Sequence, residues 1–336
     1  MSLNLVRPAG ARLLVGPPED ERARLLTLER SEAQHASALA ALDCLNRCEA
    51  PASRLTAPLS FPLTVAAWNL ERCYAVEASA ALLMRERADI ALLSEVDNGM
   101  ARTGQRHTAR DLATSLGMAH AFGVEFLELD LGSEVELEFC RDDFNRHGFH
   151  GNAVLARTAL QSPVMIRLEA HGHWFRPESP ARRIGTRCAI LGLVMTTEGP
   201  LAVVSVHLES SAGTDYREAE TRTLLDAIDT LVGDMPVIVG GDLNTGLSTD
   251  GDVEQETLFA HAYGRGYERH GGPLDQATTR ASRVSRAPRR AWKLDWFLTR
   301  GVRVAESRIV AALAADGEVL SDHEMLVARV EGFSAR

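Results

Sequence analysis

The 336-residue chain has few aromatic side chains, which make up 5% of it. Proteins that bind single-stranded nucleic acid usually stack bases on aromatic rings, and the sequence shows no such stacking platform. The formal net charge is −10, which disfavours a general nucleic-acid coat, although a local basic patch can still bind a polyanion. An acidic chain also suits a site that holds a divalent cation.

Cysteines are few and scattered along the chain. An odd number without regular spacing argues against a disulfide framework and favours a reduced, cytoplasmic protein. Cys44 and Cys48 are four residues apart, but no further cysteine or histidine lies at metal-ligand spacing near them, so we expect small core residues. The five cysteines are Cys44, Cys48, Cys73, Cys140 and Cys188.

Long apolar runs are also missing. The N-terminal stretch MSLNLVRPAGARLLVG has no apolar segment like that of a signal peptide, and no other stretch is long enough to cross a membrane. We therefore expect no stable membrane insertion. The oligomeric state stays open.

The N-terminal part of the chain differs from the rest. Residues 1–17 contain several prolines and glycines and are expected to be irregular, whereas residues 19–48 are expected to be helical, with acids at their start. Residues 49–62 contain three prolines, which is typical of a linker. We expect a helical extension with its linker over 1–62 and a second domain over 63–332.

From residue 63 onwards, strands and helices alternate. This order predicts an α/β fold with two mixed sheets packed face to face and helices outside. Expected helices are 74–88, 107–116, with Gly117 as C-cap, and 217–232. Expected strands are 63–69, 89–95, 151–157, 164–168, 187–195, 201–207, 236–241, 294–299, 302–310 and 324–330.

The stretch VIVGGDLNT, residues 237–245, runs from an apolar strand into an acid and an amide. In extended chain, residues two apart point the same way, so Asp242 and Asn244 face one spot. Gly240 and Gly241 leave room for a close approach to the backbone. An Asp-Asn turn explains the pair equally well when it is considered alone.

Other strands end in the same way, which makes turn chemistry a poor explanation for all of them. Glu95 and Asp322 offer the hard oxygen ligands that Mg²⁺ and Mn²⁺ prefer. Amides orient a water or a phosphate oxygen, imidazoles donate to a phosphate or a leaving group, and a carboxylate fixes an imidazole tautomer. The polar residues at strand ends are Asn69, Glu95, His207, Asp242, Asn244, Asp295, Asp322 and His323.

Together these groups suit metal-assisted attack of water on a phosphate ester. Their motifs, in this order, resemble the endonuclease/exonuclease/phosphatase superfamily over roughly residues 63–330. The resemblance implies a four-layer α/β sandwich with the site at one end. The matching motifs are AWNLE (67–71), LLSEVD (92–97), FHGNAVLAR (149–157), VVSVHLES (203–210), VGGDLNT (239–245), WKLDWFL (292–298) and LSDHEML (320–326).

The resemblance also implies roles. Glu95 would be the principal metal ligand, with Asn69 close to it and Asp322 at or near the metal. Asp242 would activate the attacking water, and Asn244 would contact the phosphate. His323, paired with Asp295, would bind the phosphoryl oxygen, and His207 would contact the phosphate or the leaving group.

Further contacts with the substrate are expected from His150 and Asn152, which lie in the FHGNAVLAR motif, and from Arg187 in a small arginine cluster. The basic stretch 278–293 either grips a polyanion or is a solvated loop. Two positions depart from many relatives, namely Ser94 in place of glutamine and Met325 in place of proline.

The sequence therefore predicts an Mg²⁺- or Mn²⁺-dependent phosphodiesterase, with nucleic acid as the leading substrate class. A small-molecule or lipid phosphate is the alternative, and the same metal site acting on a substrate without phosphate is a third possibility. A non-catalytic binding module is disfavoured, because Glu95, Asp242 and His323 are all present.

Overall fold

A computed structural model describes residues 6–10, 12–169, 173–179, 181–286 and 290–334. The helices are α1 Glu19–Leu26, α2 Glu32–Ala41, α3 Val76–Arg85, α4 Thr108–Leu116, α5 Glu134–Leu137, α6 Thr214–Val232 and α7 Thr257–Gly264. The strands are β1 Val6–Gly10, β2 Cys48–Glu49, β3 Leu63–Arg72, β4 Ile90–Asn98, β5 Ala119–Glu128, β6 Phe149–Ala156, β7 Gln161–Arg167, β8 Arg183–Gly185, β9 Cys188–Thr196, β10 Gly199–His207, β11 Val237–Asp242, β12 Glu268–His270, β13 Asp295–Arg300, β14 Val302–Val310 and β15 Met325–Phe333.

The fold is mixed α/β, with helices on both sides of a large mixed sheet. Within the described residues the hydrogen-bonded strand order is β12-β13-β11-β10-β9-β7-β1-β2-β5-β6-β4-β3-β15-β14, with β8 paired to β5. The pairs β3–β4, β10–β11 and β1–β2 are parallel, and the other pairs are antiparallel. Two halves of this sheet, β12 to β7 and β5 to β14, are thus joined through the short strands β1 and β2.

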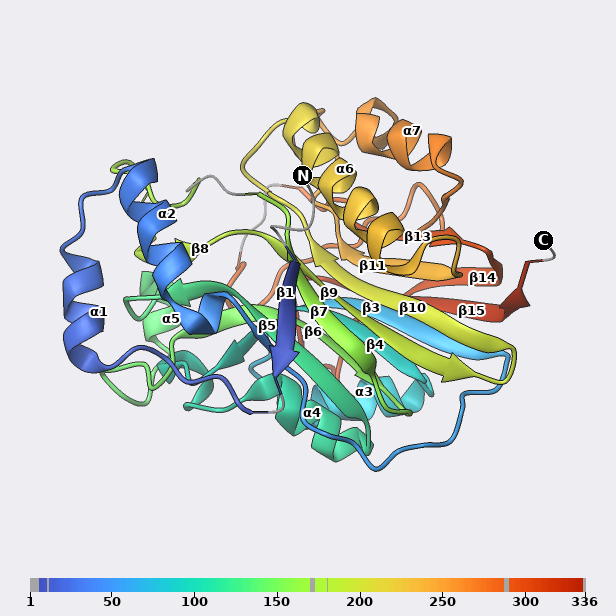
Figure 1. Ribbon diagram of the computed structural model, residues 1–336, viewed down its shortest axis with the longest axis horizontal. Coiled ribbons are helices and arrows are strands. Elements are labelled where there is room, and N and C mark those ends of the chain that lie inside the picture. Colours follow the sequence, from blue (N-terminus) through green and yellow to red (C-terminus); the bar gives the residue numbers. More distant parts are fainter. Residues whose placement is uncertain (1–5, 11, 170–172, 180, 287–289, 335–336) are drawn as a thin grey trace.

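Three apolar layers follow from the alternation of side chains along the strands. The middle layer lies between the two halves and includes Leu92 of β4, Val203 of β10 and Phe297 of β13. One outer layer packs the β3–β6 half against α3 and α4, and the other packs β10, β11 and β13 against α6 and α7. Figure 1 shows α6 and α7 on one side of the strands and α3 and α4 on the other.

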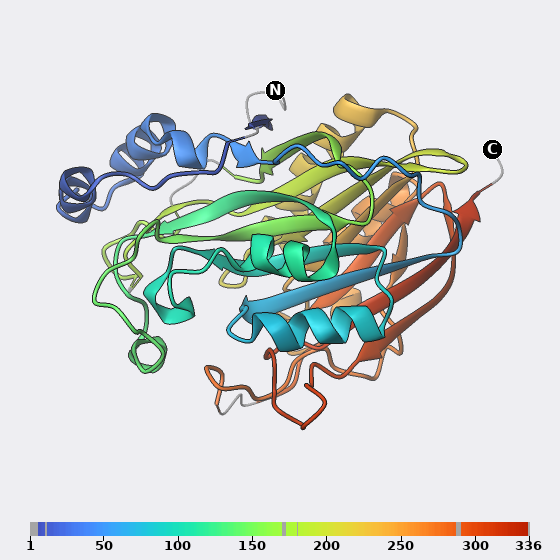
Figure 2. The same ribbon diagram turned by 90° about the horizontal axis from the view of Figure 1, so that it is seen from below.

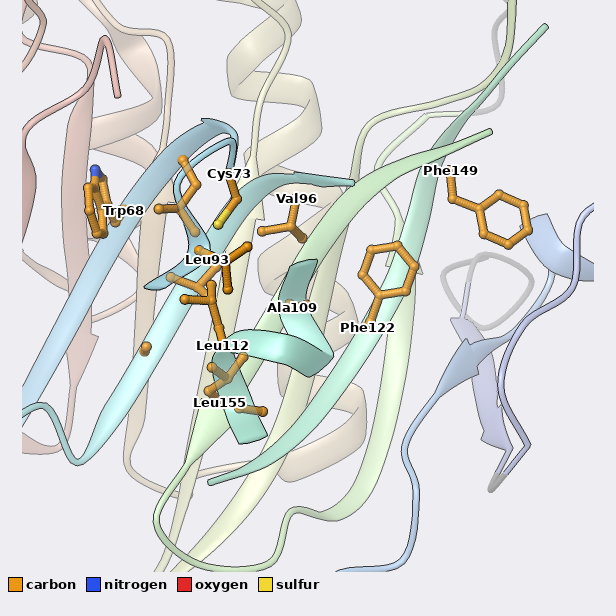
Figure 3. Packing of buried hydrophobic residues seen from close by; sticks show 14 of the residues in the cluster. Trp68, Cys73, Leu93, Val96, Ala109, Leu112, Phe122, Phe149 and Leu155 are labelled. Atoms are coloured by element: carbon orange, nitrogen blue, oxygen red, sulfur yellow. The ribbon is translucent and has the colours of Figure 1, made fainter. Parts of the chain in front are cut away.

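The expected central helices are confirmed with small shifts at their ends. Gly117 ends α4 in a left-handed conformation with φ of +63°, as its position predicts. Leu112 of α4 lies near Leu93 of β4 and Leu155 of β6 in the outer layer (Figure 3). The buried side of α6 includes Leu224, Leu225 and Ile228, so the amphipathic pattern identified the correct face.

The N-terminal part is built differently from the expectation. Residues 6–10 form β1, which pairs with β7 and β2, although the sequence indicated an irregular segment. The stretch 19–48 contains two α-helices in place of one, because α1 ends at Leu26 and Ser31 caps the start of α2. Figure 2 shows both helices at one end of the molecule, away from α3.

Besides the short elements β2, α5, β8 and β12, two longer elements were not expected. Strand β5 pairs along its length with β6, and α7 packs on α6. The β5 sequence AHAFGVEFLE is apolar but carries acids and no clean alternation, so its pattern alone did not mark a strand. The hairpin of β9 and β10 around Glu198 and Gly199 is confirmed. No helix in the described part of the chain is long and apolar enough to cross a membrane.

Candidate active site

The polar residues at the strand ends meet at one end of the sheet halves. His207 ends β10, Asp242 ends the parallel neighbour β11, and Asp295 begins the antiparallel neighbour β13, so the three are register partners in turn. Parallel strands bring their carboxyl ends to the same edge, where α/β proteins place their chemistry. From the opposite half, β3 contributes Asn69 and β4 contributes Glu95.

The glycines before Asp242 have a structural use. A Cβ atom on Gly241, whose φ is +154°, would lie 1.9 Å from the carbonyl oxygen of Val206, and one on Gly240 would lie 2.7 Å from the ring of Phe297. The groups that approach the backbone of these glycines closely are therefore the neighbouring strand β10 and a core side chain. They allow β11 to deliver Asp242 to the sheet edge.

Asp242 lies at the centre of the candidate site and is 2% exposed. Its Oδ2 accepts a hydrogen bond of 3.0 Å from the amide of Asn69, and its Oδ1 accepts one of 2.9 Å from the backbone N–H of Asn244. The Asn244 side chain donates to the Leu208 carbonyl oxygen at 2.8 Å. Burial alone would raise the pKa of Asp242, but His323 and His207 outweigh it and lower the pKa, so the carboxylate is held ionised.

The first imidazole beside Asp242 belongs to His323. Its Nδ1 lies 2.8 Å from Oδ2 of Asp295, and its Nε2 lies 3.6 Å from Oδ2 of Asp242. Trp68 donates its indole N–H to the His323 carbonyl oxygen at 2.9 Å and fixes the backbone there. Burial alone would lower the pKa of His323, but Asp295 and Asp242 outweigh it and raise the pKa well above the usual range. The ring is therefore a cationic donor.

The second imidazole belongs to His207, whose Nε2 also lies 3.6 Å from Oδ2 of Asp242. Its Nδ1 lies 3.3 Å from Oε2 of Glu125, on the strand β5 that sequence reasoning missed. Burial alone would raise the pKa of Glu125, but His207 and Arg187 lower it. Two imidazole–carboxylate pairs thus flank one aspartate.

Arg187 and Asn152 lie behind His207. Arg187 is 4% exposed and forms ion pairs of 2.6 Å with Glu125 and 3.1 Å with Glu209. Asn152 is fully buried and donates to Glu125 at 3.1 Å and to the Cys188 carbonyl oxygen at 2.8 Å. Direct substrate contact by these two residues stays a prediction, and their position favours support of Glu125 and His207.

Glu95 lies on the other side of Asn69. Its Oε1 accepts a hydrogen bond of 3.1 Å from the Asn69 amide, and its Oε2 is paired with Arg72. The Nε2 of His150 lies 3.9 Å from the same Glu95 oxygen, while its Nδ1 lies 3.0 Å from Asp97. Asn69 therefore connects Glu95 to Asp242 through one amide group.

Asp322 and Glu71 add negative charge to this side of the site. Burial raises the pKa of Asp322, and burial together with the charge of Asp322 raises the pKa of Glu71 to about 7. Buried carboxylates that repel one another in this way are stabilised by a cation. The oxygen-rich set of Glu95, Asp322 and the Asn69 amide therefore fits Mg²⁺ or Mn²⁺.

A second group beside it also has ligand-type atoms at metal spacing, namely Asp242, Asp295 and His323. In this group both nitrogens of His323 already face carboxylates, and burial is outweighed by those carboxylates, which raise the pKa of the ring. A protonated imidazole is no metal ligand. The raised pKa of His323 favours a proton donor over a metal ligand in this group.

Several non-glycine residues at this site have a left-handed backbone conformation. Glu95 has φ of +53°, Asn244 of +51° and Glu71 of +43°. Non-glycine residues rarely adopt this conformation, and such strain tends to collect at functional sites. At Glu95 it coincides with an irregularity in the pairing of β4 with β6 between Leu93 and Val96, which turns the carboxylate towards Asn69.

The basic stretch 278–293 contacts the site, but its described arginines are paired with acids. Ser282 donates a hydrogen bond to Glu71, and the Arg280 backbone N–H donates to the Asp322 carbonyl oxygen at 2.8 Å. The four described arginines Arg280, Arg283, Arg286 and Arg290 each form an ion pair with an acid. Arg289 lies outside the described residues. The loop therefore presents less free positive charge than its sequence suggests.

Comparison with known proteins identifies the family of this chain. The model of the endonuclease/exonuclease/phosphatase family matches residues 66–323, a span that contains every site residue named above. The chain belongs to this family. Its members are usually hydrolases that act on phosphate esters. A search of curated protein sequences gives no match.

Solved structures of the family share the fold at low sequence identity. An endonuclease/exonuclease/phosphatase from Beutenbergia cavernae is 18% identical with a TM-score of 0.56, covering 81% of this chain and 72% of its own. The human Nocturnin catalytic domain with bound sulfate is 19% identical with a TM-score of 0.54, covering 83% and 97%. Humanized D. rerio TDP2 is 16% identical with a TM-score of 0.52, covering 80% and 98%.

Proposed function

We propose that this protein is a divalent-metal-dependent hydrolase of phosphate esters, and specifically a phosphodiesterase. The observation that carries the proposal is the position of Asp242. Its Oδ2 receives the Asn69 amide and faces the Nε2 atoms of His207 and His323. A carboxylate base between two imidazoles brings a proton acceptor, the proton donor His323 and a further hydrogen-bonding ring to one reacting centre.

Glu95, Asp322 and the Asn69 side chain would hold the metal. A bound Mg²⁺ or Mn²⁺ would neutralise phosphate charge and favour the attacking water. The carboxylate of Glu95 is 19% exposed, so it is open to an ion and a substrate. Arg72, which is paired with Glu95, also forms an ion pair of 2.9 Å with Glu136. It would keep this second ion pair when a metal ion binds to Glu95 in its place.

The protein groups then divide the proton transfers. Ionised Asp242 accepts a proton from the attacking water, while the cationic His323 donates a hydrogen bond from Nε2 to a phosphoryl oxygen and stabilises its charge. Asp295 keeps the His323 ring oriented through Nδ1. His207, held by Glu125 and contacted by Nη1 of Arg187, lies where it would contact the phosphate or the leaving oxygen. Asn244 and His150 would contact the phosphate.

Nucleic acid is the leading substrate class in this proposal, because the family name covers nucleases and Nocturnin is solved with sulfate, an anion of phosphate shape. The ion pairs of the four described arginines in stretch 278–293 favour a second candidate, a small-molecule phosphodiester. Such a substrate needs no long basic groove.

We also propose a four-layer α/β sandwich over residues 63–332, with 1–62 as an extension. The three apolar layers support four layers of secondary structure. The pairing of β1 with β7 and of β2 with β5 means that this extension would complete the sheet.

The test is hydrolysis of bis-p-nitrophenyl phosphate and p-nitrophenyl phosphate with Mg²⁺, Mn²⁺ or EDTA. The proposal predicts chelator-sensitive cleavage, faster on the diester. Cleavage of neither ester by folded, metal-loaded protein, together with no cleavage of plasmid DNA, would contradict it.

A further inference from the structure

A second cluster of ligand-type side chains lies outside the candidate active site. Glu49 comes from β2, His120 from β5, and His107 from the residue that precedes α4. One carboxylate oxygen and one ring nitrogen from each histidine all lie within 4.8 Å of one another. None of these residues touches the groups assigned above to phosphate chemistry in the contacts described for them.

The geometry converges on one oxygen of Glu49. The Nε2 of His107 is hydrogen-bonded to Oε1 of Glu49, and the Nε2 of His120 lies 3.5 Å from the same atom. The other oxygen of Glu49 accepts a 2.8 Å hydrogen bond from the backbone N–H of Leu14, which orients the carboxylate. The ring of His107 packs edge-on against Phe122 with centroids 5.0 Å apart.

The cluster is incompletely satisfied as a hydrogen-bonded group. His120 is 9% exposed, and its buried Nε2 has no hydrogen-bond partner. A buried ring nitrogen without a partner is costly unless something else binds it. His120 also lines a cavity of about 230 Å³, together with Gly10, Ala50 and Pro51. That cavity gives an ion a route in and leaves room for a water ligand.

We propose that Glu49, His107 and His120 bind a divalent transition-metal ion of the zinc class. Two imidazoles and one carboxylate, with water in the remaining position, are a ligand set that such ions accept. Mg²⁺ is disfavoured there, because it prefers oxygen ligands and near-octahedral geometry. The ion would occupy the space between the three donor atoms and replace the hydrogen bond between His107 and Glu49.

Metal binding at Nε2 of His107 places its remaining proton on Nδ1. That atom now accepts a long contact of 3.3 Å from the backbone N–H of Arg110. This contact is lost when the ion binds, which is a small cost beside coordination of a buried carboxylate and two imidazoles.

The place of the cluster gives the ion a structural role. Glu49 pairs with Gly10 of β1 on one side and with Phe122 of β5 on the other. Strands β1 and β2 connect the two halves of the sheet. A metal bound to β2, β5 and the start of α4 would link residues 1–62 to the domain over residues 63–332, where β1 and β2 join the two halves of the sheet.

Zinc content tests the site directly. The metal-stripped full-length protein is dialysed against Zn²⁺ with excess Mg²⁺, and zinc per chain is measured by mass spectrometry. The measurement uses a Glu95→Gln/Asp242→Asn background, so that zinc at the proposed active-site ligands does not contribute. We expect about one ion per chain, lost in Glu49→Gln and in His120→Ala. The matched control is His35→Ala, which removes a histidine that is 1% exposed and lies in α2, and it should retain zinc.

Equal zinc in the parent and in His120→Ala, or none in either, would overturn the proposal and leave a buried ion pair. A second readout needs no variant at the cluster. In the same background, Zn²⁺ should raise the melting temperature and protect residues 1–62 from proteolysis, and a chelator should reverse both effects. A melting temperature and a proteolysis pattern that do not change with Zn²⁺ would also overturn the proposal.

Discussion

His207 and His323 each place Nε2 3.6 Å from one and the same oxygen of Asp242, although they belong to opposite halves of the sheet. Each ring is held from behind by its own carboxylate, Glu125 for His207 and Asp295 for His323. This arrangement gives the proposed hydrolysis one base and two imidazoles, and each of these groups can be tested by a single substitution.

Asp242→Asn and His323→Ala should each lower kcat/KM for a phosphodiester by at least ~100-fold, because positioned acid–base and electrostatic groups contribute factors of this size. Steady-state kinetics at saturating Mg²⁺ measure the loss. The control is Asp250→Asn, which removes an acid whose side chain is 97% exposed. Near-normal rates in both site variants would show that the centre lies elsewhere.

Glu95→Gln should raise the Mg²⁺ or Mn²⁺ concentration needed for half-maximal activity, because it removes an anionic ligand while keeping the shape of the side chain. The measurement is a metal titration of activity, with circular dichroism to follow the fold. The melting temperature without metal should change little. A large fall in that temperature would instead identify Glu95 as a structural partner of Arg72.

Glu125→Gln should lower turnover by about 10–100-fold, as is typical when the group that orients a functional imidazole is changed. Glu125 is a positioning residue in this account, so the variant should also change the pH profile of kcat through His207. The pH–rate profile is compared with that of the parent. An unchanged profile with a uniformly lower rate would point to a packing defect around Arg187.

Arg102→Met should destabilise the fold by about 3–5 kcal/mol at pH 7, because removing one partner leaves buried charges without compensation. Arg102 binds Asp97 at 2.8 Å and Glu128 at 2.8 Å, and all three are buried. Burial alone would raise the pKa of both acids, but Arg102 lowers it.

The sign of the pH effect follows from that lowering. Carboxylates with a lowered folded pKa stabilise the fold above their unfolded pKa of about 4, and the stabilisation is lost as pH falls through the folded value. The difference between Arg102→Met and the parent in urea unfolding should therefore shrink between pH 6 and about 3. A difference independent of pH would show that Arg102 acts by packing alone.

Removal of residues 1–62 should expose the edges of β7 and β5, which now pair with β1 and β2. Unpaired edges invite association between chains, so the truncated protein should melt at a lower temperature and aggregate on heating. Light scattering during a thermal scan measures this. A monomeric truncated protein with the melting temperature of the full chain would make the extension dispensable.

The sequence was most informative where residues of functional types lie near the ends of predicted strands. Asn69, Glu95, Asp242 and His323 converge as expected, because each lies near the end of a buried strand whose apolar residues predict its direction and edge. The central helices were predictable for the same reason, since their apolar stripes face the sheet.

Partners that depend on long-range pairing were not predictable in this way. Glu125 lies in β5, whose buried acids obscure the strand pattern, and its use becomes visible only beside His207 and Arg187. The short strand β1 carries no alternation of its own, and its pairing is set by β7. Glu49 and His107 are 58 residues apart and meet only in the folded sheet.

The most direct test of the central claim compares the parent protein with Asp242→Asn for hydrolysis of bis-p-nitrophenyl phosphate at increasing Mg²⁺ or Mn²⁺, with EDTA as the blank. The account predicts activity that rises with metal, is abolished by EDTA and falls at least ~100-fold in Asp242→Asn. Activity that is insensitive to EDTA, or equal in the two proteins, would contradict it.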